Sequence, residues 1–269
     1  MQRVLSSKPI GIFDSGVGGL TVANAVCKAF PNEQIVYFGD TAHLPYGDKS
    51  ADAIRYYSIK ISKFLLEQEC KMIVIACNSA SSAAYEVLID FFKEKCTFIN
   101  VVDPLVKEVV HREYQKVGVI ATKATVRSNI YKHKIESYNQ NIKVHQLATP
   151  LLVPMIEEGF YNDEISDSVL NKYLGHHDLK GIDALLLACT HYPLIKKEIK
   201  NFFNNEVDVL DSTDVVVDEI KNYLSSNDLE NMGTKKENLF YVSDFTKSFE
   251  ETTKLFFDDL VQLKVEEIW

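Results

Sequence analysis

Two cysteines in matching surroundings are the residues of this chain whose types and spacing suggest chemistry. Cys77 follows the apolar run KMIVIA, and Cys189 follows the apolar run ALLLA. Each run suits a buried strand, and the small polar residues after each cysteine suit the start of a helix. Ligands of open α/β sheets bind at the carboxyl ends of the strands, so the pattern predicts two thiols facing one cleft. Reaction on both faces of one carbon requires such a pair of opposed acid/base groups.

Other interpretations of the cysteines compete with this one. A cysteine after a buried strand is more often a packing residue than a chemical one, and we assign packing to Cys27, Cys70 and Cys96. Five cysteines without a CxxC spacing argue against a disulfide framework and against a structural zinc site. The Cys-x-His sequence at 189–191 could bind a metal, but zinc needs about three or four such ligands and the motifs do not supply them. A Cys-His hydrolase is a further alternative, and it leaves the second thiol unexplained.

Composition limits the class of protein. The 269 residues are 46% hydrophobic, which is enough for a large core in one long domain or two modest ones. The formal net charge is −9, and the sequence contains no basic run that could follow a phosphate backbone. We therefore expect no nucleic acid partner. Residues 1–9 carry no apolar signal region, and no apolar run reaches the roughly 18 residues of a membrane span. We therefore expect a cytoplasmic protein without a membrane partner.

The elements that must position the two cysteines alternate as strand and helix, which is typical of an α/β fold with mostly parallel sheets. The first half contains four such pairs, with strands at 10–13, 34–39, 71–76 and 97–102 and helices at 20–30, 51–69, 79–92 and 105–113. Pro104 is expected at the first position of the last of these helices. The second half has strands at 116–122, 142–146 and 184–188, a short helix or turn at 151–159 and a helix at 163–174. The tail adds strands at 207–210 and 239–242 and helices at 213–224 and 245–257.

Landmarks of the first half recur in the second half. Gly118 follows Gly11 by 107 residues in a similar apolar setting, and Cys189 follows Cys77 by 112 residues. The similar offsets predict an internal duplication, which would place both cysteines at equivalent strand ends.

The glycine-rich turn at 14–19, DSGVGG, does not match a nucleotide-binding motif. Its first two glycines fit the dinucleotide fingerprint, but the third position falls on Thr21, and no Gly-Lys-Ser/Thr follows. What remains is Asp14 and Ser15 on a flexible turn at the ligand edge of the predicted sheet. A role for Asp14 as a simple helix cap is an equally good interpretation from spacing alone.

Four motifs together resemble the glutamate racemase family. They are DSGxGG at 14–19, GDT at 39–41 with PYG at 45–47, CNSAS at 77–81, and CTHYP at 189–193. They occur in the family's order and extend over nearly the whole chain. The two cysteines alone would suggest the wider amino-acid racemase superfamily, whereas the first and last motifs indicate the glutamate enzyme. Ser79 stands where the family usually has threonine, and it keeps the hydroxyl while losing a methyl group.

The resemblance implies a cofactor-independent racemase, without metal, that makes D-glutamate for bacterial cell-wall peptidoglycan. It also implies two α/β domains of similar fold with the active site in the cleft between them. Mapped onto this chain, the first domain is 1–102 with 212–269, and the second is 103–211. Family members are often dimers, which leaves a homodimer open here.

The resemblance also assigns roles to individual residues. Cys77 and Cys189 would transfer the α-proton on opposite faces, with Asp14 assisting on the Cys77 side and His191 on the Cys189 side. Asp40 matches an acidic residue whose role would be auxiliary. The matched substrate-binding positions are Ser15, Pro45, Tyr46, Gly47, Asn78, Ser79, Thr122 and Thr190. No arginine or lysine lies inside the motifs, so N–H groups and hydroxyls are expected to bind the substrate carboxylates.

Two alternatives to a glutamate enzyme stay open. A racemase or isomerase of aspartate or another small dicarboxylate would use the same thiol pair in a different pocket. A non-catalytic binding protein of the same fold would convert neither enantiomer.

Overall fold

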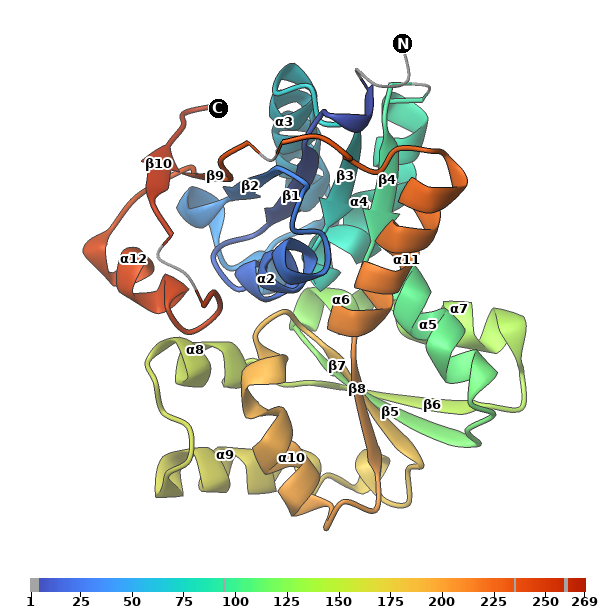
Figure 1. The fold of residues 1–269 in the computed structure, drawn as a ribbon. Coiled ribbons are helices and arrows are strands. Elements are labelled where there is room, and N and C mark those ends of the chain that lie inside the picture. Colours follow the sequence, from blue (N-terminus) through green and yellow to red (C-terminus); the bar gives the residue numbers. More distant parts are fainter. Residues whose placement is uncertain (1–4, 94, 235, 259–260) are drawn as a thin grey trace.

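Two separate parallel sheets, one above the other in Figure 1, form the framework of the protein. The computed structural model describes residues 5–93, 95–234, 236–258 and 261–269. The upper sheet has six strands in the order β10-β9-β2-β1-β3-β4, and the lower sheet has four in the order β6-β5-β7-β8. Every strand pair in both sheets is parallel. The predicted α/β fold with two parallel sheets is therefore confirmed.

The upper sheet is covered by helices on both faces. Its strands are β1 (Ile10–Asp14), β2 (Ile35–Gly39), β3 (Met72–Ile75), β4 (Thr97–Asn100), β9 (Leu239–Val242) and β10 (Leu263–Val265). Its helices are α2 (Leu20–Ala29), α3 (Ala51–Glu67), α4 (Asn78–Phe91), α11 (Thr213–Ser226) and α12 (Lys247–Thr253). Alternate side chains of β1, β2 and β3 pack on α2 and α11 at one face and on α3 and α4 at the other. Burial on both faces explains why these strands read as continuous apolar runs.

The lower sheet repeats this arrangement with fewer strands. They are β5 (Lys116–Ala121), β6 (Lys143–Ala148), β7 (Ala184–Ala188) and β8 (Asp208–Asp211). The helices around it are α5 (Val102–His111), α6 (Lys123–Ser128), α7 (Ile130–Tyr138), α8 (Leu152–Glu157), α9 (Glu164–Leu174) and α10 (Lys196–Phe202). One face packs on α5 and α7 and the other on α8, α9 and α10. The order β6-β5-β7-β8 reproduces the order β2-β1-β3-β4 of the upper sheet, as an internal duplication requires.

Several elements differ from the sequence prediction. Helix α5 begins at Val102 rather than at 105, because Asn100 accepts hydrogen bonds from the N–H groups of Val102 and Asp103 at 2.8 Å. Helices α6 and α7 occupy a stretch that the sequence analysis left unassigned. Helix α12 is shorter than the predicted helix at 245–257, and β10 was not expected.

The C-terminal segment returns to the upper sheet. Strand β9 pairs with β2, and β10 pairs with β9. The buried Lys71 side chain adds a second attachment, because its Nζ donates to the carbonyl oxygen of Leu229 at 2.8 Å and to Glu33 Oε2 at 2.6 Å. The chain after β8 thus completes a sheet that the first hundred residues begin.

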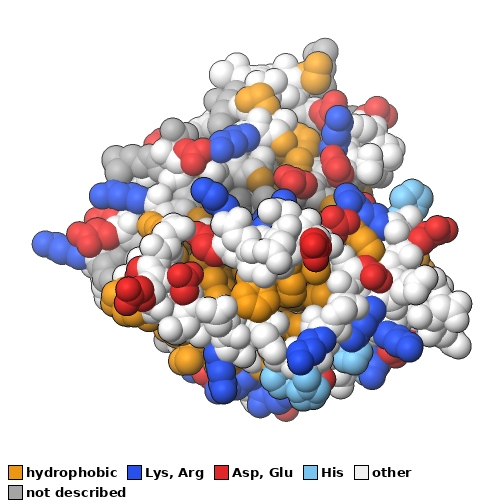
Figure 2. Space-filling model, turned by 90° about the horizontal axis from the view of Figure 1, so that it is seen from below, with side chains coloured by type: hydrophobic (Ala, Val, Ile, Leu, Met, Phe, Trp, Pro, Cys, Tyr) orange, Lys and Arg blue, Asp and Glu red, His pale blue; other side chains and the backbone are white. Residues whose placement is uncertain are grey.

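The surface agrees with the charge balance of the sequence. On the face seen in Figure 2, basic and acidic side chains are interspersed among the described residues, and no continuous basic area covers it. None of the described helices combines the length and apolar character needed to cross a bilayer.

Candidate active site

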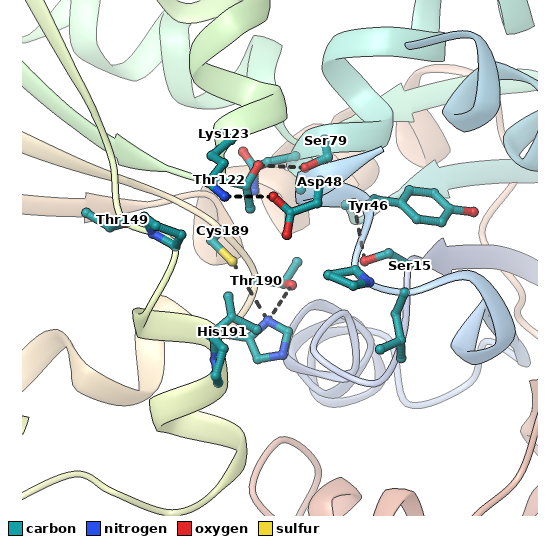
Figure 3. Close-up of a pocket in the computed structure, with 18 of the residues that line it drawn as sticks. Ser15, Tyr46, Asp48, Ser79, Thr122, Lys123, Thr149, Cys189, Thr190 and His191 are labelled. Carbon is teal, nitrogen blue, oxygen red and sulfur yellow. Dashed lines mark hydrogen bonds and ion pairs between the residues drawn. The ribbon is translucent and has the colours of Figure 1, made fainter. Parts of the chain in front are cut away.

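A pocket of about 300 Å³ lies where the carboxyl ends of strands from both sheets meet. Figure 3 shows side chains from both halves of the molecule pointing into it. Most of the residues predicted from the sequence line this pocket: Cys77, Cys189, His191, Ser15, Pro45, Tyr46, Gly47, Asn78, Ser79, Thr122 and Thr190. Asp14 and Asp40 are not among the lining residues and lie buried behind them.

Cys77 lies at the end of β3 and caps the long helix α4. Its Sγ accepts a hydrogen bond from the N–H of Ala80 at 3.4 Å, and its thiol donates to Ser15 Oγ at 3.7 Å. Burial, and after it the charge of Asp14, raises the pKa of Cys77 to about 12, although the contacts with Ala80 and Ser15 oppose the rise. Cys77 is therefore a protonated thiol near neutral pH.

Cys189 lies at the end of β7, the equivalent strand of the lower sheet, beside a histidine. His191 Nδ1 is 3.8 Å from Cys189 Sγ, and His191 Nε2 is 2.9 Å from Glu157 Oε1 (Figure 3 labels Cys189 and His191). Burial disfavours the imidazolium, but hydrogen bonds to Cys189 and Glu157 outweigh it and raise the pKa of His191 to about 10. A protonated imidazole is the partner that a nearby thiolate needs.

The chain after Cys189 differs from the prediction of a helix start. A short 3₁₀ turn at Tyr192–Ile195 follows, and only then the seven-residue helix α10. The Cys189 sulfur therefore has the His191 side chain beside it, whereas the Cys77 sulfur lies at the N-terminus of a regular helix.

Asp14 holds the glycine-rich turn. Its Oδ2 accepts hydrogen bonds from the N–H groups of Gly16 at 3.2 Å and Gly19 at 2.9 Å, while its buried Oδ1 has no partner among the described residues. The N-cap of α2 is Gly19, so Asp14 does not occupy the capping position itself. Burial raises the pKa of Asp14, and the positive charge of His191 opposes that rise.

Asp40 supports the pocket wall from behind. It accepts hydrogen bonds from the hydroxyls of Tyr46 and Ser243 at 2.7 Å, and its Oδ1 lies 2.9 Å from His43 Nδ1. Tyr46 lines the pocket, whereas Ser243 follows β9 of the C-terminal segment. Asp40 thereby connects the tail of the chain to the wall of the pocket.

Two glycines allow the halves of the molecule to approach each other. A Cβ at Gly18 would lie 2.2 Å from His191 Cε1, and a Cβ at Gly47 would lie 2.9 Å from Thr122 Cβ. Separations under about 3.0 Å do not occur between real atoms of this kind. Gly18 of the glycine-rich turn thus makes room for His191 of the opposite half, which explains this glycine without any nucleotide.

Polar contacts cross the pocket between the two halves. The hydroxyls of Ser79 and Thr122 are 2.8 Å apart, and the Thr21 hydroxyl donates to the carbonyl oxygen of Thr190 at 2.7 Å. Tyr131 donates to Asn78 Oδ1 at 2.7 Å. The matched substrate-binding residues are therefore arranged partly by one another.

Several lining residues were not predicted from the sequence. They are Leu44, Asp48, Lys123, Thr149, Pro150, Val153, Pro154, Glu157 and Tyr192. Tyr192 lies inside the last motif and could have been found there, and Lys123 directly follows Thr122. Lys123 Nζ is 3.1 Å from Asp48 Oδ1 in a half-exposed ion pair across the pocket (Figure 3). Glu157 and His191 are 34 residues apart, and no sequence pattern predicts their contact.

Candidate metal ligands gather elsewhere. In the described part of the chain, one group of three such side chains is close enough to share an ion, and it consists of His176, His177 and Asp178. None of the three lines the pocket.

Known proteins similar to this chain are racemases. Residues 21–220 match the model of the family described as Asp/Glu/Hydantoin racemase. A glutamate racemase of Chlorobaculum parvum is 38% identical over 95% of this chain and 94% of its own length. Among solved structures, glutamate racemase from Francisella tularensis in complex with D-glutamate superposes with a TM-score of 0.93 at 38% identity, covering 98% of both chains. The Thermus thermophilus enzyme in complex with beta-chloro-D-alanine gives 0.87 at 34% identity, covering 97% of this chain and 98% of its own. The chain therefore belongs to the Asp/Glu/Hydantoin racemase family and, within it, to the glutamate racemases, which are amino-acid racemases.

Proposed function

We propose that this protein interconverts L- and D-glutamate by moving the α-proton between Cys77 and Cys189. The observation that carries the proposal is the placement of two thiols, at the ends of equivalent strands of two sheets, on the lining of one pocket. The similarity to a glutamate racemase with D-glutamate bound supports glutamate as the substrate. Aspartate stays the alternative substrate to be tested.

The surroundings of the thiols define a starting state for the reaction. His191 Nδ1 lies 3.8 Å from Cys189 Sγ, so the imidazolium favours negative charge on that sulfur, and Cys77 is the thiol. The Cys189 sulfur removes the α-proton from one face, and the electron pair of the C–H bond stays on the substrate as a carbanion. The Cys77 thiol then gives its proton to the opposite face, which leaves Cys77 as the thiolate and Cys189 as the thiol. The reverse reaction runs the same steps from the other enantiomer.

The polar groups of the pocket suit a dicarboxylate. Hydroxyls of Ser79, Thr122 and Thr190 line it, together with the N-terminus of the 14-residue helix α4. Free N–H groups at a helix N-terminus favour anions. Lys123 adds a positive charge that the sequence prediction did not include, although Asp48 neutralises it.

Three further expectations belong to this proposal. Residues 1–102 with 212–269 form one domain and 103–211 the other, which the pairing of β9 with β2 supports. The protein makes D-glutamate in the cytoplasm, and this D-glutamate is used for cell-wall peptidoglycan. The protein needs neither cofactor nor metal, and a homodimer stays open.

Circular dichroism of the purified protein, incubated separately with L- and D-glutamate without added cofactor, tests the reaction. The signal should decay to zero from both enantiomers, because racemisation ends at an equal mixture. EDTA should leave the rate unchanged, and added pyridoxal phosphate should not increase it. Conversion of aspartate in preference to glutamate would replace the proposed substrate, and conversion of neither would refute an enzymatic role for the pocket.

A further inference from the structure

The oxygen of the Asn78 side-chain amide accepts a hydrogen bond, whereas its nitrogen has no hydrogen-bond partner among the described residues. Asn78 is the first residue of α4, directly after Cys77, and it lines the pocket while being 2% exposed. Its Nδ2 is buried and has no hydrogen-bond partner among the described residues. A buried amide NH₂ without a partner costs free energy, so its retention beside a reacting thiol indicates a ligand that accepts its hydrogen bond.

Tyr131 holds the other half of this amide. Its hydroxyl donates to Asn78 Oδ1 at 2.7 Å from helix α7, in the opposite half of the molecule. The ring is fully buried in the core between α5, α7 and the lower sheet, which fixes its position. Burial also raises the pKa of Tyr131, so the hydroxyl keeps its proton and acts as a donor throughout the working pH range.

The hydrogen bond from Tyr131 stabilises one of the two ways in which the amide can face. An asparagine amide can rotate to present either its oxygen or its nitrogen, and the two ends have opposite hydrogen-bonding character. A tyrosine hydroxyl that donates to Oδ1 stabilises the orientation in which Nδ2 is left for another partner. A carboxylate can accept from Nδ2, whereas it would be repelled by Oδ1.

We infer that Tyr131 is a positioning residue that orients the Asn78 amide so that its NH₂ group donates to a carboxylate of the bound substrate. The inference rests on the proposed function and adds a residue from outside the pocket lining. It also joins the two halves, because Tyr131 belongs to the lower sheet's core and Asn78 to a helix of the upper sheet.

The first experiment compares Tyr131→Phe with the wild type in glutamate racemisation. The variant keeps the ring and loses the hydroxyl, so the amide is free to rotate. KM should rise about tenfold for both enantiomers, as expected for a weakened hydrogen bond to a charged group, while kcat stays within about twofold. Tyr223→Phe is the matched control, since it removes a 2.7 Å hydroxyl contact with Thr97 that lies outside the pocket. The control should lower the melting temperature by a similar amount and leave KM unchanged.

A double-mutant cycle with Asn78→Ala separates positioning from general packing. If Tyr131 acts through the amide, Tyr131→Phe should produce no further rise in KM once Asn78 is alanine. An equal KM effect in both backgrounds, or an unchanged KM in the single variant, would overturn the inference while wild-type turnover leaves the proposed function standing. Absence of turnover in the wild type itself would overturn the proposed function and this inference with it.

Discussion

The surroundings of Cys77 and Cys189 differ although the two residues occupy equivalent places. Both follow the third strand of a β2-β1-β3-β4 type of sheet, β3 in one case and β7 in the other. Cys77 caps the long helix α4, whereas Cys189 precedes a 3₁₀ turn and a short helix. Repetition of the fold thus places both cysteines on the lining of one pocket, and it does not give them the same surroundings.

The difference is electrostatic. The Cys77 thiol has the buried Asp14 carboxyl nearby and a pKa of about 12, while Cys189 has the imidazole of His191, whose pKa is raised to about 10. The positive charge therefore lies on the Cys189 side. Under the proposed mechanism the two thiols need not have the same surroundings, since each is regenerated by the reverse step.

Serine at either cysteine gives the largest expected effect. Cys77→Ser and Cys189→Ser should each lower racemisation by about a thousandfold or more, because a hydroxyl is a far weaker acid than a thiol. The surviving thiol can still exchange the α-proton on the face it meets. In deuterated water, NMR should therefore show slow exchange of one glutamate enantiomer in one variant and of the other enantiomer in the second. Identical preferences would contradict the opposed placement of the thiols.

Alanine at Gly18 should have the next largest effect, and it acts on the Cys189 side alone. The new Cβ would lie 2.2 Å from His191 Cε1, so the imidazole must move. Displacement of a catalytic group by about 1 Å can cost roughly a hundredfold in rate, and kcat should fall by about that factor. Gly16→Ala is the control, because its Cβ would meet only Leu44 at 3.4 Å, an ordinary contact. Equal losses in both variants would mean that the turn, rather than His191, is responsible.

Glutamine at Glu157 should lower kcat/KM about tenfold and change the pH profile. Glu157 raises the pKa of His191, so its removal lowers that pKa, and the imidazolium is lost at lower pH. The fall of activity at high pH, expected near pH 10 in the wild type, should move toward neutrality. Because the folded-state pKa of His191 is raised, its stabilising charge is fully present below about pH 6.5 and is lost as pH rises through about 10.

The control for this prediction is the exposed neighbour Glu158. Glu158→Gln changes the same net charge without touching His191, so its pH profile should match the wild type. A shifted profile in both variants would attribute the effect to overall charge. An unshifted pH profile in Glu157→Gln would show that Glu157 does not control the pH dependence of the Cys189 side.

Sequence alone could predict the strand ends of this fold but not the contacts between distant side chains. The runs before Cys77 and Cys189 are apolar throughout because β3 and β7 are buried on both faces. Glu157 and His191 meet only because α8 packs beside the turn after β7, and no spacing records that contact. Helices α6 and α7 escaped prediction because their sequences are largely polar and because Asn129, with φ of 55°, interrupts them.

Alanine at Ser15 should have the smallest effect, and it probes the Cys77 side. The contact between Cys77 Sγ and Ser15 Oγ is long, at 3.7 Å, and it lowers the pKa of Cys77 less than burial raises it. When Cys77 ionises, the Ser15 hydroxyl can donate to the thiolate, and loss of this weak hydrogen bond of about 0.5 kcal/mol should reduce the thiolate fraction of Cys77 by about twofold at any pH below its pKa. The measurement is the rate of iodoacetamide alkylation at pH 9 in a Cys189→Ser background, with the Cys77 peptide identified by mass spectrometry. A tenfold loss would show that Ser15 matters to Cys77 as much as Glu157 does to His191, and the two sides would then be equally assisted.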